Sequence, residues 1–312
     1  MRSASTVALP MKLLLFSDVH LPTPLRGVPL RDWAGKRLIG GANWLIRRRR
    51  AFASAVVKVD ALAELARREG VSAVVFTGDY TVLGTEAELA AAREVFAPFF
   101  AWSYVGLPGN HDLYLADTVR HRRFERHLGD TLRTDLPELA TDGPWPLVRL
   151  LDDTAAIVAF ESARPNPQPW RSSGRVPPRQ LAALSLIAAD PRIAHRFLFL
   201  ATHYAPRLGN GQPDTRQHGL DNADALLATI APFERAVLLH GHVHHCYHLA
   251  VPGVGPSLFS AGSATYAGRE GCWLFELEGA RLSARRGRYR SGAWQLDEPF
   301  RVPDAPPSPA SD

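Results

Sequence analysis

The sequence predicts an α/β fold, because strand-like and helix-like segments alternate along most of the chain. Short apolar runs typical of buried strands occur at residues 12–16, 73–76, 102–105, 155–160, 196–201 and 235–239. Patterns typical of helices lie between several of them, at residues 51–69, 85–99, 178–189 and 222–231. Such alternation favours βαβ units and a layered architecture.

The last part of the chain predicts a second sheet. Beyond residue 246 the pattern changes to short strands separated by turn signals, at residues 246–250, 257–260, 271–278 and 280–289. We interpret these strands as a meander that completes the second sheet. No internal repeat or clear linker interrupts the pattern, so we expect residues 11–302 to form a single domain.

The composition is that of a globular cytoplasmic protein. The 312 residues are 46% hydrophobic and 21% charged, which is ordinary for such proteins. The two cysteines, Cys246 and Cys272, form no CxxC pair, so a disulfide framework and a thiolate zinc site are both disfavoured. The sequence has no uncharged apolar run of about 18 residues, the length that a membrane span needs.

Both ends of the chain are expected to lie outside the domain. Met11 is an alternative start, which would make residues 1–10 a dispensable leader. We reject a cleaved signal peptide, because cleavage would remove the strand that leads into Asp18. Residues 303–312 are rich in Pro, Ser and Ala and are expected to be disordered.

Five short motifs rich in carboxylate, amide and imidazole groups each follow a strand-like run. They are Asp18-Val19-His20, Gly78-Asp79, Gly109-Asn110-His111-Asp112, His203 and Gly241-His242-Val243-His244. Residues at the carboxyl ends of strands in an α/β sheet can meet in one cleft although they are far apart in sequence. Their oxygen and imidazole ligands suit Mn²⁺, Fe, Zn²⁺ or Mg²⁺, and the sequence does not choose between these ions.

In this order and spacing, the motifs resemble those of the calcineurin-like metallophosphoesterases over residues 12–265. The resemblance implies two facing β-sheets flanked by helices, with a cleft for two divalent ions, Mn, Fe or Zn, at the carboxyl ends of the strands. It also implies that Asp79 is shared by the two metal sites. The first site would consist of Asp18, His20, Asp79 and His244, and the second of Asp79, Asn110, His203 and His242.

The same resemblance implies how a phosphoester is cut. A metal-bound hydroxide would be the nucleophile, so no covalent intermediate is needed. His111 would contact the phosphate and protonate the leaving oxygen, and Asp112 would orient the His111 ring.

Residues 25–50 form a basic insert between the first motif and the next helix. Residues 21–50 hold eight basic side chains and one acid, a net charge of +7 against +5 for the whole chain. Large apolar residues interleave with them, which favours a surface helix that meets an anionic membrane. Packing of the apolar residues on the core is the alternative, and nucleic acid is not an expected partner. The predicted substrate or membrane contacts are Lys36, Arg37, Asn43, Trp44, Arg47 and Arg48.

The run Lys36-Arg37-Leu38-Ile39-Gly40, followed by Asn43-Trp44, also resembles an insert in UDP-2,3-diacylglucosamine pyrophosphohydrolases of the metallophosphoesterase type. This resemblance implies hydrolysis of a nucleotide-linked lipid at a pyrophosphate in lipid A synthesis, with the protein peripheral on the inner membrane. A soluble phosphodiesterase of the cyclic-nucleotide type would use the same metal residues. A non-catalytic membrane-binding scaffold would be expected to have lost several of them. The sequence assigns no role to His218, His240, His245 or Cys246.

Overall fold

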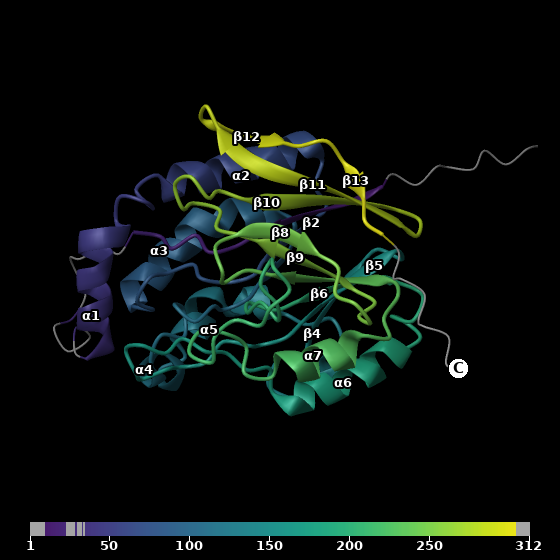
Figure 1. Cartoon of the computed structure of the whole chain (residues 1–312), viewed down its shortest axis with the longest axis horizontal. Coiled ribbons are helices and arrows are strands. Elements are labelled where there is room, and N and C mark those ends of the chain that lie inside the picture. Colours follow the sequence, from purple (N-terminus) through teal and green to yellow (C-terminus); the bar gives the residue numbers. More distant parts are fainter. Residues whose placement is uncertain (1–9, 23–28, 30–32, 34, 304–312) are drawn as a thin grey trace, which may run out of the picture.

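The computed structural model describes residues 10–22, 29, 33 and 35–303. Two β-sheets stack face to face in the centre of the molecule, and helices cover their outer faces (Figure 1). The predicted α/β fold with two facing sheets is confirmed. The predicted leader and tail lie almost entirely outside the described residues, and so does most of the insert before residue 35.

The first sheet has the strand order β12–β11–β10–β1–β2–β3, with β13 paired to β11. Its three neighbouring parallel strands are β1 (Met11–Phe16), β2 (Ala73–Phe76) and β3 (Ser103–Gly106). Its antiparallel strands are β10 (Cys272–Glu278), β11 (Arg281–Arg290), β12 (Ala293–Leu296) and β13 (Phe300–Arg301).

The second sheet has the order β4–β5–β6–β7–β9–β8. Its parallel strands are β5 (Ala155–Ala159), β6 (Phe197–Ala201), β7 (Ala236–His240) and β9 (Ser257–Ala261). Antiparallel strands close its two edges, and these are β4 (Leu147–Leu151) and β8 (Cys246–Leu249).

The predicted meander after residue 246 is divided between the two sheets. β8 and β9 join the second sheet, whereas β10 to β13 extend the first sheet beyond β1. The expectation that all of these strands complete the second sheet was therefore wrong. Strand-like patterns show that a segment is extended, but they do not show which of two buried edges it pairs with.

The helices have ordinary start and stop signals. α3 (Glu86–Phe96) begins with a reciprocal capping box between Thr85 and Glu88. α2 (Ala55–Glu69) ends at Gly70, which adopts the left-handed conformation that favours glycine. The other helices on the sheets and in the loops are α4 (Ala116–Arg120), α5 (Arg123–Leu128), α6 (Pro178–Ala189) and α7 (Ala223–Ile230), with short 3₁₀ turns at Ala97–Ala101, Gly129–Leu132 and Pro137–Leu139.

The core lies between the sheets and beneath the helices. Phe275 of β10 lies 5.8 Å from Phe199 of β6 and 4.9 Å from Phe259 of β9, measured between ring centres, so aromatic rings fill the space between the two sheets. α2 packs on the outer face of the first sheet, where the indole of Trp294 donates to the Lys58 carbonyl at 3.0 Å. This packing sets the carboxyl ends of the parallel strands of both sheets at one end of the sandwich.

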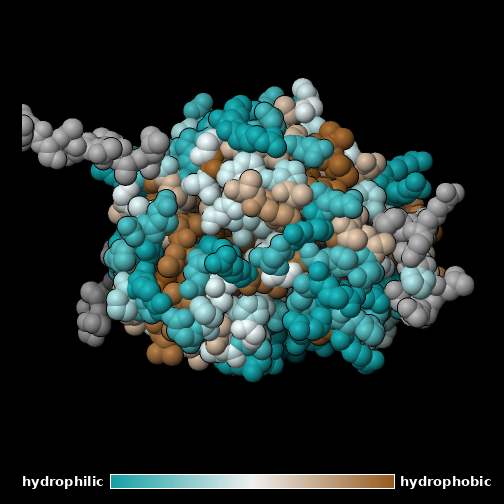
Figure 2. All heavy atoms as spheres, turned by 180° about the vertical axis from the view of Figure 1, so that it is seen from behind, coloured by the Kyte–Doolittle hydropathy of each residue, from teal (hydrophilic) through white to brown (hydrophobic). Residues whose placement is uncertain are grey.

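One helical element covers neither sheet face. α1 (Lys36–Asn43) and the π-helical turn that continues it (Trp44–Arg48) stand at one end of the molecule (Figure 1). In the described part of the chain, no helix is long and apolar enough to cross a membrane. The face opposite to that of Figure 1 is mainly hydrophilic, with apolar side chains in separate patches (Figure 2).

Candidate metal centre

All seven predicted metal ligands lie in loops directly after the carboxyl ends of parallel strands. Asp18 and His20 follow β1, Asp79 follows β2 and Asn110 follows β3, all in the first sheet. The second sheet contributes His203 after β6, and His242 and His244 after β7. Because the two sheets face each other, these loops meet across the end of the sandwich.

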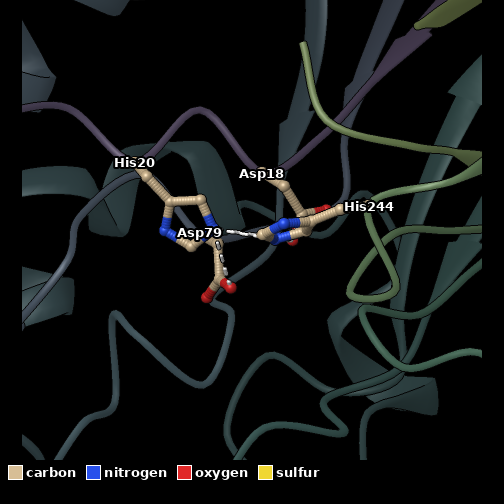
Figure 3. Close-up of side chains that lie close together, drawn as sticks. All are labelled: Asp18, His20, Asp79 and His244. Carbon is tan, nitrogen blue, oxygen red and sulfur yellow. Dashed lines mark hydrogen bonds and ion pairs between the residues drawn. The ribbon is translucent and has the colours of Figure 1, made fainter. Parts of the chain in front are cut away.

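The first predicted ligand set comes together as a compact cluster. One ligand atom from each of Asp18, His20, Asp79 and His244 lies within 4.8 Å of the others. The two carboxylates and the two rings point toward one another (Figure 3). The Nε2 atom of His244 is 3.1 Å from Asp18 Oδ1 and 3.0 Å from His20 Nε2.

The second predicted set adjoins the first through Asp79. Asp79 Oδ2 lies 3.7 Å from His20 Nε2 and 3.6 Å from His203 Nε2, so it stands between the two groups. His203 Nε2 is 3.1 Å from Asn110 Oδ1, and His242 Nδ1 is 3.0 Å from the same oxygen. This position of Asp79 is the one that a ligand shared by two ions requires.

Backbone carbonyls determine which ring nitrogen of His20, His203 and His242 is available to bind a metal ion. Three rings donate an N–H to a carbonyl: His20 Nδ1 to Thr81 at 3.0 Å, His203 Nδ1 to Thr77 at 2.7 Å and His242 Nε2 to His218 at 2.8 Å. A carbonyl can only accept, so the other nitrogen of each neutral ring carries a lone pair. Hydrogen bonds of this kind orient metal-ligating histidines.

The donor atoms are of the kinds that bind divalent cations. The lone pairs of His203 Nε2 and His242 Nδ1 both face the side-chain amide of Asn110, whose oxygen could join them in binding one cation. Asp18 Oδ1 is buried, with His244 Nε2 3.1 Å away. Burial of a carboxylate is costly, and a bound cation would offset that cost.

Burial keeps the donor groups in the protonation states that bind metal. It lowers the pKa of His203, and together with His203 it lowers the pKa of His242 well below its usual value, so both rings are neutral. Burial acts to raise the pKa of Asp18, but His244, His203 and Ser17 together outweigh it, and the net pKa is below its usual range. Neutral imidazoles and an ionised carboxylate are the forms that coordinate cations.

The ligand loops have unusual backbone conformations. Five ligands adopt a positive φ, namely Asp18, His20, Asp79, His242 and His244. Glycines allow the loops to lie against one another: a Cβ on Gly109 would lie 2.1 Å from Asp79 Oδ1, and one on Gly241 would lie 2.0 Å from Ser17 Oγ. Sequence reasoning identified the ligand types but not this strained backbone, which no local pattern indicates.

The ring of His111 lies 4.7 Å from that of His20, at the edge of the cluster, and Asp112 follows it in the same loop. His111 Nδ1 donates to the carbonyl of Val82 at 2.6 Å, so that carbonyl orients the ring. The Asp112 carboxylate accepts hydrogen bonds from four backbone N–H groups and one hydroxyl, those of Asp79, Tyr80, Thr81, Gly109 and the Thr81 side chain. Asp112 therefore holds the loops after β2 and β3 together.

Comparison with known proteins identifies the family. The profile of the calcineurin-like phosphoesterases matches residues 11–246 of the chain. The chain belongs to the calcineurin-like phosphoesterase family. Members of this family use two divalent ions, and the clustered donors are consistent with that requirement.

Two solved structures share the fold of this phosphoesterase. A dimetal phosphatase from Danio rerio superposes with a TM-score of 0.62 at 14% identity, over 93% of this chain and 99% of that one. A purple acid phosphatase from yellow lupin superposes with a TM-score of 0.61 at 9% identity, over 97% of this chain and 57% of that one. Such low identities show a shared fold alone. A sequence search of curated proteins found no match.

Part of the insert of the phosphoesterase is a packed wall of the metal cleft. Arg37 is 2% exposed and makes a two-pronged ion pair with Asp117 of α4 at 2.7 and 3.0 Å. Trp44 is also 2% exposed and packs on Phe52. The expectation that Arg37 and Trp44 contact substrate or membrane is therefore corrected, because both side chains attach α1 to the rest of the protein.

Two of the other predicted insert residues lie at the cavity. Lys36 and Asn43 line the cavity above the metal residues. Lys36 Nζ donates to the carbonyls of Asn166 at 2.8 Å and Arg171 at 2.9 Å, and burial lowers the pKa of Lys36 to about 8. The side chains of Arg47 and Arg48 lie outside the described part of the chain.

The cavity above the metal residues has a volume of about 500 Å³. Sequence reasoning missed several of its lining residues, namely Tyr114, Pro169, Trp170, Arg171, Ser172 and Asp214, and left His218 unassigned. His218 supports the centre through its carbonyl, which accepts from His242, and its ring nitrogen Nδ1 lies 2.8 Å from Ser172 Oγ. These residues lie in loops without a motif, so only the tertiary structure brings them together.

Proposed function

We propose that the phosphoesterase hydrolyses a phosphoester or pyrophosphate that carries a large apolar group, and that its preferred substrate is a nucleotide-linked lipid such as UDP-2,3-diacylglucosamine. The observation that carries this proposal is that the metal residues form the floor of a cavity whose wall is the insert helix α1. That wall presents the cationic Lys36 beside the apolar Ile39. One cleft therefore contains side chains that can bind a phosphate and side chains that can contact an apolar group.

In the proposed reaction the seven ligands would hold two divalent ions. When bound, such ions activate water and neutralise the charge that develops on the phosphoryl group. His111 would serve as the proton donor to the leaving oxygen. Its Nδ1 proton is engaged by the Val82 carbonyl, so the exchangeable proton would be carried on Nε2.

A lipid-linked substrate is supported by the exposed apolar side chains of the insert. Leu38, Ile39, Leu45 and Ile46 are exposed by 60%, 55%, 43% and 81%. Exposed apolar area next to a catalytic cleft favours an apolar ligand or surface. We also propose that this strip touches an anionic membrane, with the exposed Arg49 and Arg50 near the lipid headgroups. The cytoplasmic location stays a prediction.

A soluble phosphodiesterase of the cyclic-nucleotide type is the second candidate. The burial of Arg37 and Trp44 favours this candidate. Side chains packed against the protein would let the insert cover a small soluble substrate without contacting a membrane. A non-catalytic membrane-binding scaffold is disfavoured, because the chain keeps every expected ligand and the ligands converge.

The test compares two substrates on purified protein with added Mn²⁺. We expect release of UMP from UDP-2,3-diacylglucosamine and little turnover of cyclic AMP. Asp79→Asn is the control that should abolish either activity while leaving the fold intact by circular dichroism. Turnover of cyclic AMP with no turnover of the lipid would replace the first candidate with the second. Hydrolysis that survives Asp79→Asn would exclude the dinuclear assignment.

A further inference from the structure

Two large apolar side chains that line the metal cavity are strongly exposed to water. Ile39 on α1 is 55% exposed, and Trp170 on the loop after β5 is 66% exposed. Both line the same cavity, together with Pro169. An exposed tryptophan is unusual because its large apolar surface is normally buried, and an exposed apolar pair that lines a ligand cavity points to a ligand.

The Trp170 wall is rigid, so the exposure of Trp170 does not come from a loose loop. Arg171 N donates to the Gln168 carbonyl at 3.1 Å and closes a turn that projects Trp170 outward. The Ser172 carbonyl accepts from the Tyr204 hydroxyl at 2.5 Å. The ring of Tyr204 in turn lies 4.2 Å from that of His242, so this wall is joined to the metal centre.

The Ile39 wall is equally well anchored. Gly40 allows α1 to lie close to the cavity, because a Cβ at that position would lie 2.3 Å from the Tyr114 hydroxyl. Lys36 then connects the two walls through its hydrogen bonds to the carbonyls of Asn166 and Arg171. The spacing between Ile39 and Trp170 is thus set by the protein before any ligand binds, which lowers the entropic cost of binding.

We infer that Ile39, Pro169 and Trp170 form an apolar subsite that binds the non-phosphate part of the substrate. The subsite selects alkyl-bearing or similarly apolar phosphoesters over polar ones, so Ile39 and Trp170 determine specificity rather than carry out the chemistry. This inference rests on the proposed phosphoesterase activity for its biological meaning. Ligand binding to the subsite can nevertheless be measured without any turnover.

The experiment uses alkylphosphonates, whose P–C bond the reaction does not break. Binding of methyl-, butyl- and octylphosphonate to the Mn²⁺-loaded protein is measured by isothermal titration calorimetry. We expect the dissociation constant to fall at least about tenfold from methyl to octyl, as burial of a few methylene groups implies. In Trp170→Ala and Ile39→Ala that ratio should fall to about twofold, whereas Trp170→Phe should keep most of it.

Leu186 on α6 supplies the matched control, since it is 68% exposed and does not line the cavity. Leu186→Ala should keep the full octyl-to-methyl ratio. A ratio near one in the natural protein, or a full ratio in both Trp170→Ala and Ile39→Ala, would overturn the subsite. If neither UDP-2,3-diacylglucosamine nor cyclic AMP is hydrolysed while the binding ratio is present, the proposed function fails and the subsite stands.

Discussion

The metal centre depends on residues whose backbone is strained. The αL conformation of an ordinary residue costs about 1–3 kcal/mol, and five of the seven ligands adopt it. Such strain persists only where the surroundings hold it in place, and Asp112 is one of the residues that do so here. Its carboxylate collects N–H groups from the two loops that carry Asp79 and Asn110. Asp112 therefore holds together the two loops that carry these predicted ligands.

Substitution of His111 should lower activity, and substitution of Asp112 should lower stability. His111→Asn is expected to lower the rate about 100-fold or more, because the proton donor is lost, with little change in unfolding free energy. Asp112→Asn should destabilise the protein by about 3 kcal/mol, since an amide N–H₂ cannot replace an oxygen that accepts from backbone N–H groups. Initial rates and urea unfolding of both variants check this. Equal loss of stability in the two would contradict the assignment.

Glu161 should make stability depend on pH. Burial, with Asp142 and Glu125 nearby, raises the pKa of the Glu161 carboxyl from 4.5 to about 7. Between those values the folded protein binds a proton that the unfolded chain has released, so this contribution to stability falls as pH rises from about 4.5 to about 7. Glu161→Gln stays neutral and should be more stable than the parent above pH 7, by at most about 3 kcal/mol.

The comparison requires urea unfolding of metal-free protein at pH 5 and pH 8, with chelator present in every sample. The advantage of Glu161→Gln should be largest at pH 8 and small at pH 5. The same difference at both pH values would show that the carboxyl titrates normally in the folded protein.

At the scale of elements, α1 is the part of the structure that determines the shape of the cleft. Lys36 joins it to the loop after β5, and Arg37 joins it to α4. Two adjacent basic residues thus attach α1 to two separate parts of the protein. The helix lies outside both sheets, so these contacts and the packing of Trp44 hold it in place.

Removal of the Arg37 ion pair should loosen α1. Arg37→Met keeps much of the apolar stem but loses the hydrogen bonds to Asp117, Thr118 and Leu83. We expect the free energy of unfolding to fall by about 1–3 kcal/mol, because Asp117 is only partly exposed and would lose its partner. Limited proteolysis should then cut within residues 36–48. The matched control is Arg67→Met, whose exposed pair with Glu64 should contribute less than about 0.5 kcal/mol. Equal effects of the two substitutions would show that Arg37 does not anchor the helix.

The sequence predicted the elements that carry strong local signals. The predicted strands and the bounds of α6 agree closely with the structure. Strands such as β6 were predicted well because they are buried on both faces, and their sequences are continuous apolar runs. The short β4, α4 and α5 were missed because they lack a long periodic pattern. Arg37 and Trp44 were misassigned for a different reason: an arginine looks like a surface residue until its buried partner, here Asp117, is known.

At the scale of the whole molecule, exposed apolar side chains are concentrated at one end. Among the described residues, nine large hydrophobic side chains are strongly exposed, and six of them lie between residues 38 and 57. Val119 of α4, which is joined to α1 through Arg37, and Trp170 at the cavity are two others. Ile39 and Trp170 of this set line the cavity, whereas Leu186 lies on α6 and does not.

This distribution predicts binding to anionic vesicles. The protein should sediment with phosphatidylglycerol-containing vesicles and less with pure phosphatidylcholine, and salt should weaken the binding. Ile46→Ser should reduce the bound fraction severalfold, because Ile46 is 81% exposed, whereas Leu186→Ser should not. Absence of binding to both kinds of vesicle would exclude a membrane surface as the partner of this end of the molecule.

The spacing of the ligands along the chain also has a consequence for biosynthesis. The first ligand set joins residue 18 to residue 244, so a nascent chain cannot complete it until 244 of its 312 residues have been synthesised. Strand β1, which leads into Asp18, must wait longer still for its neighbour β10 at Cys272–Glu278. The complete first ligand set therefore cannot form while only the first half of the chain has been synthesised.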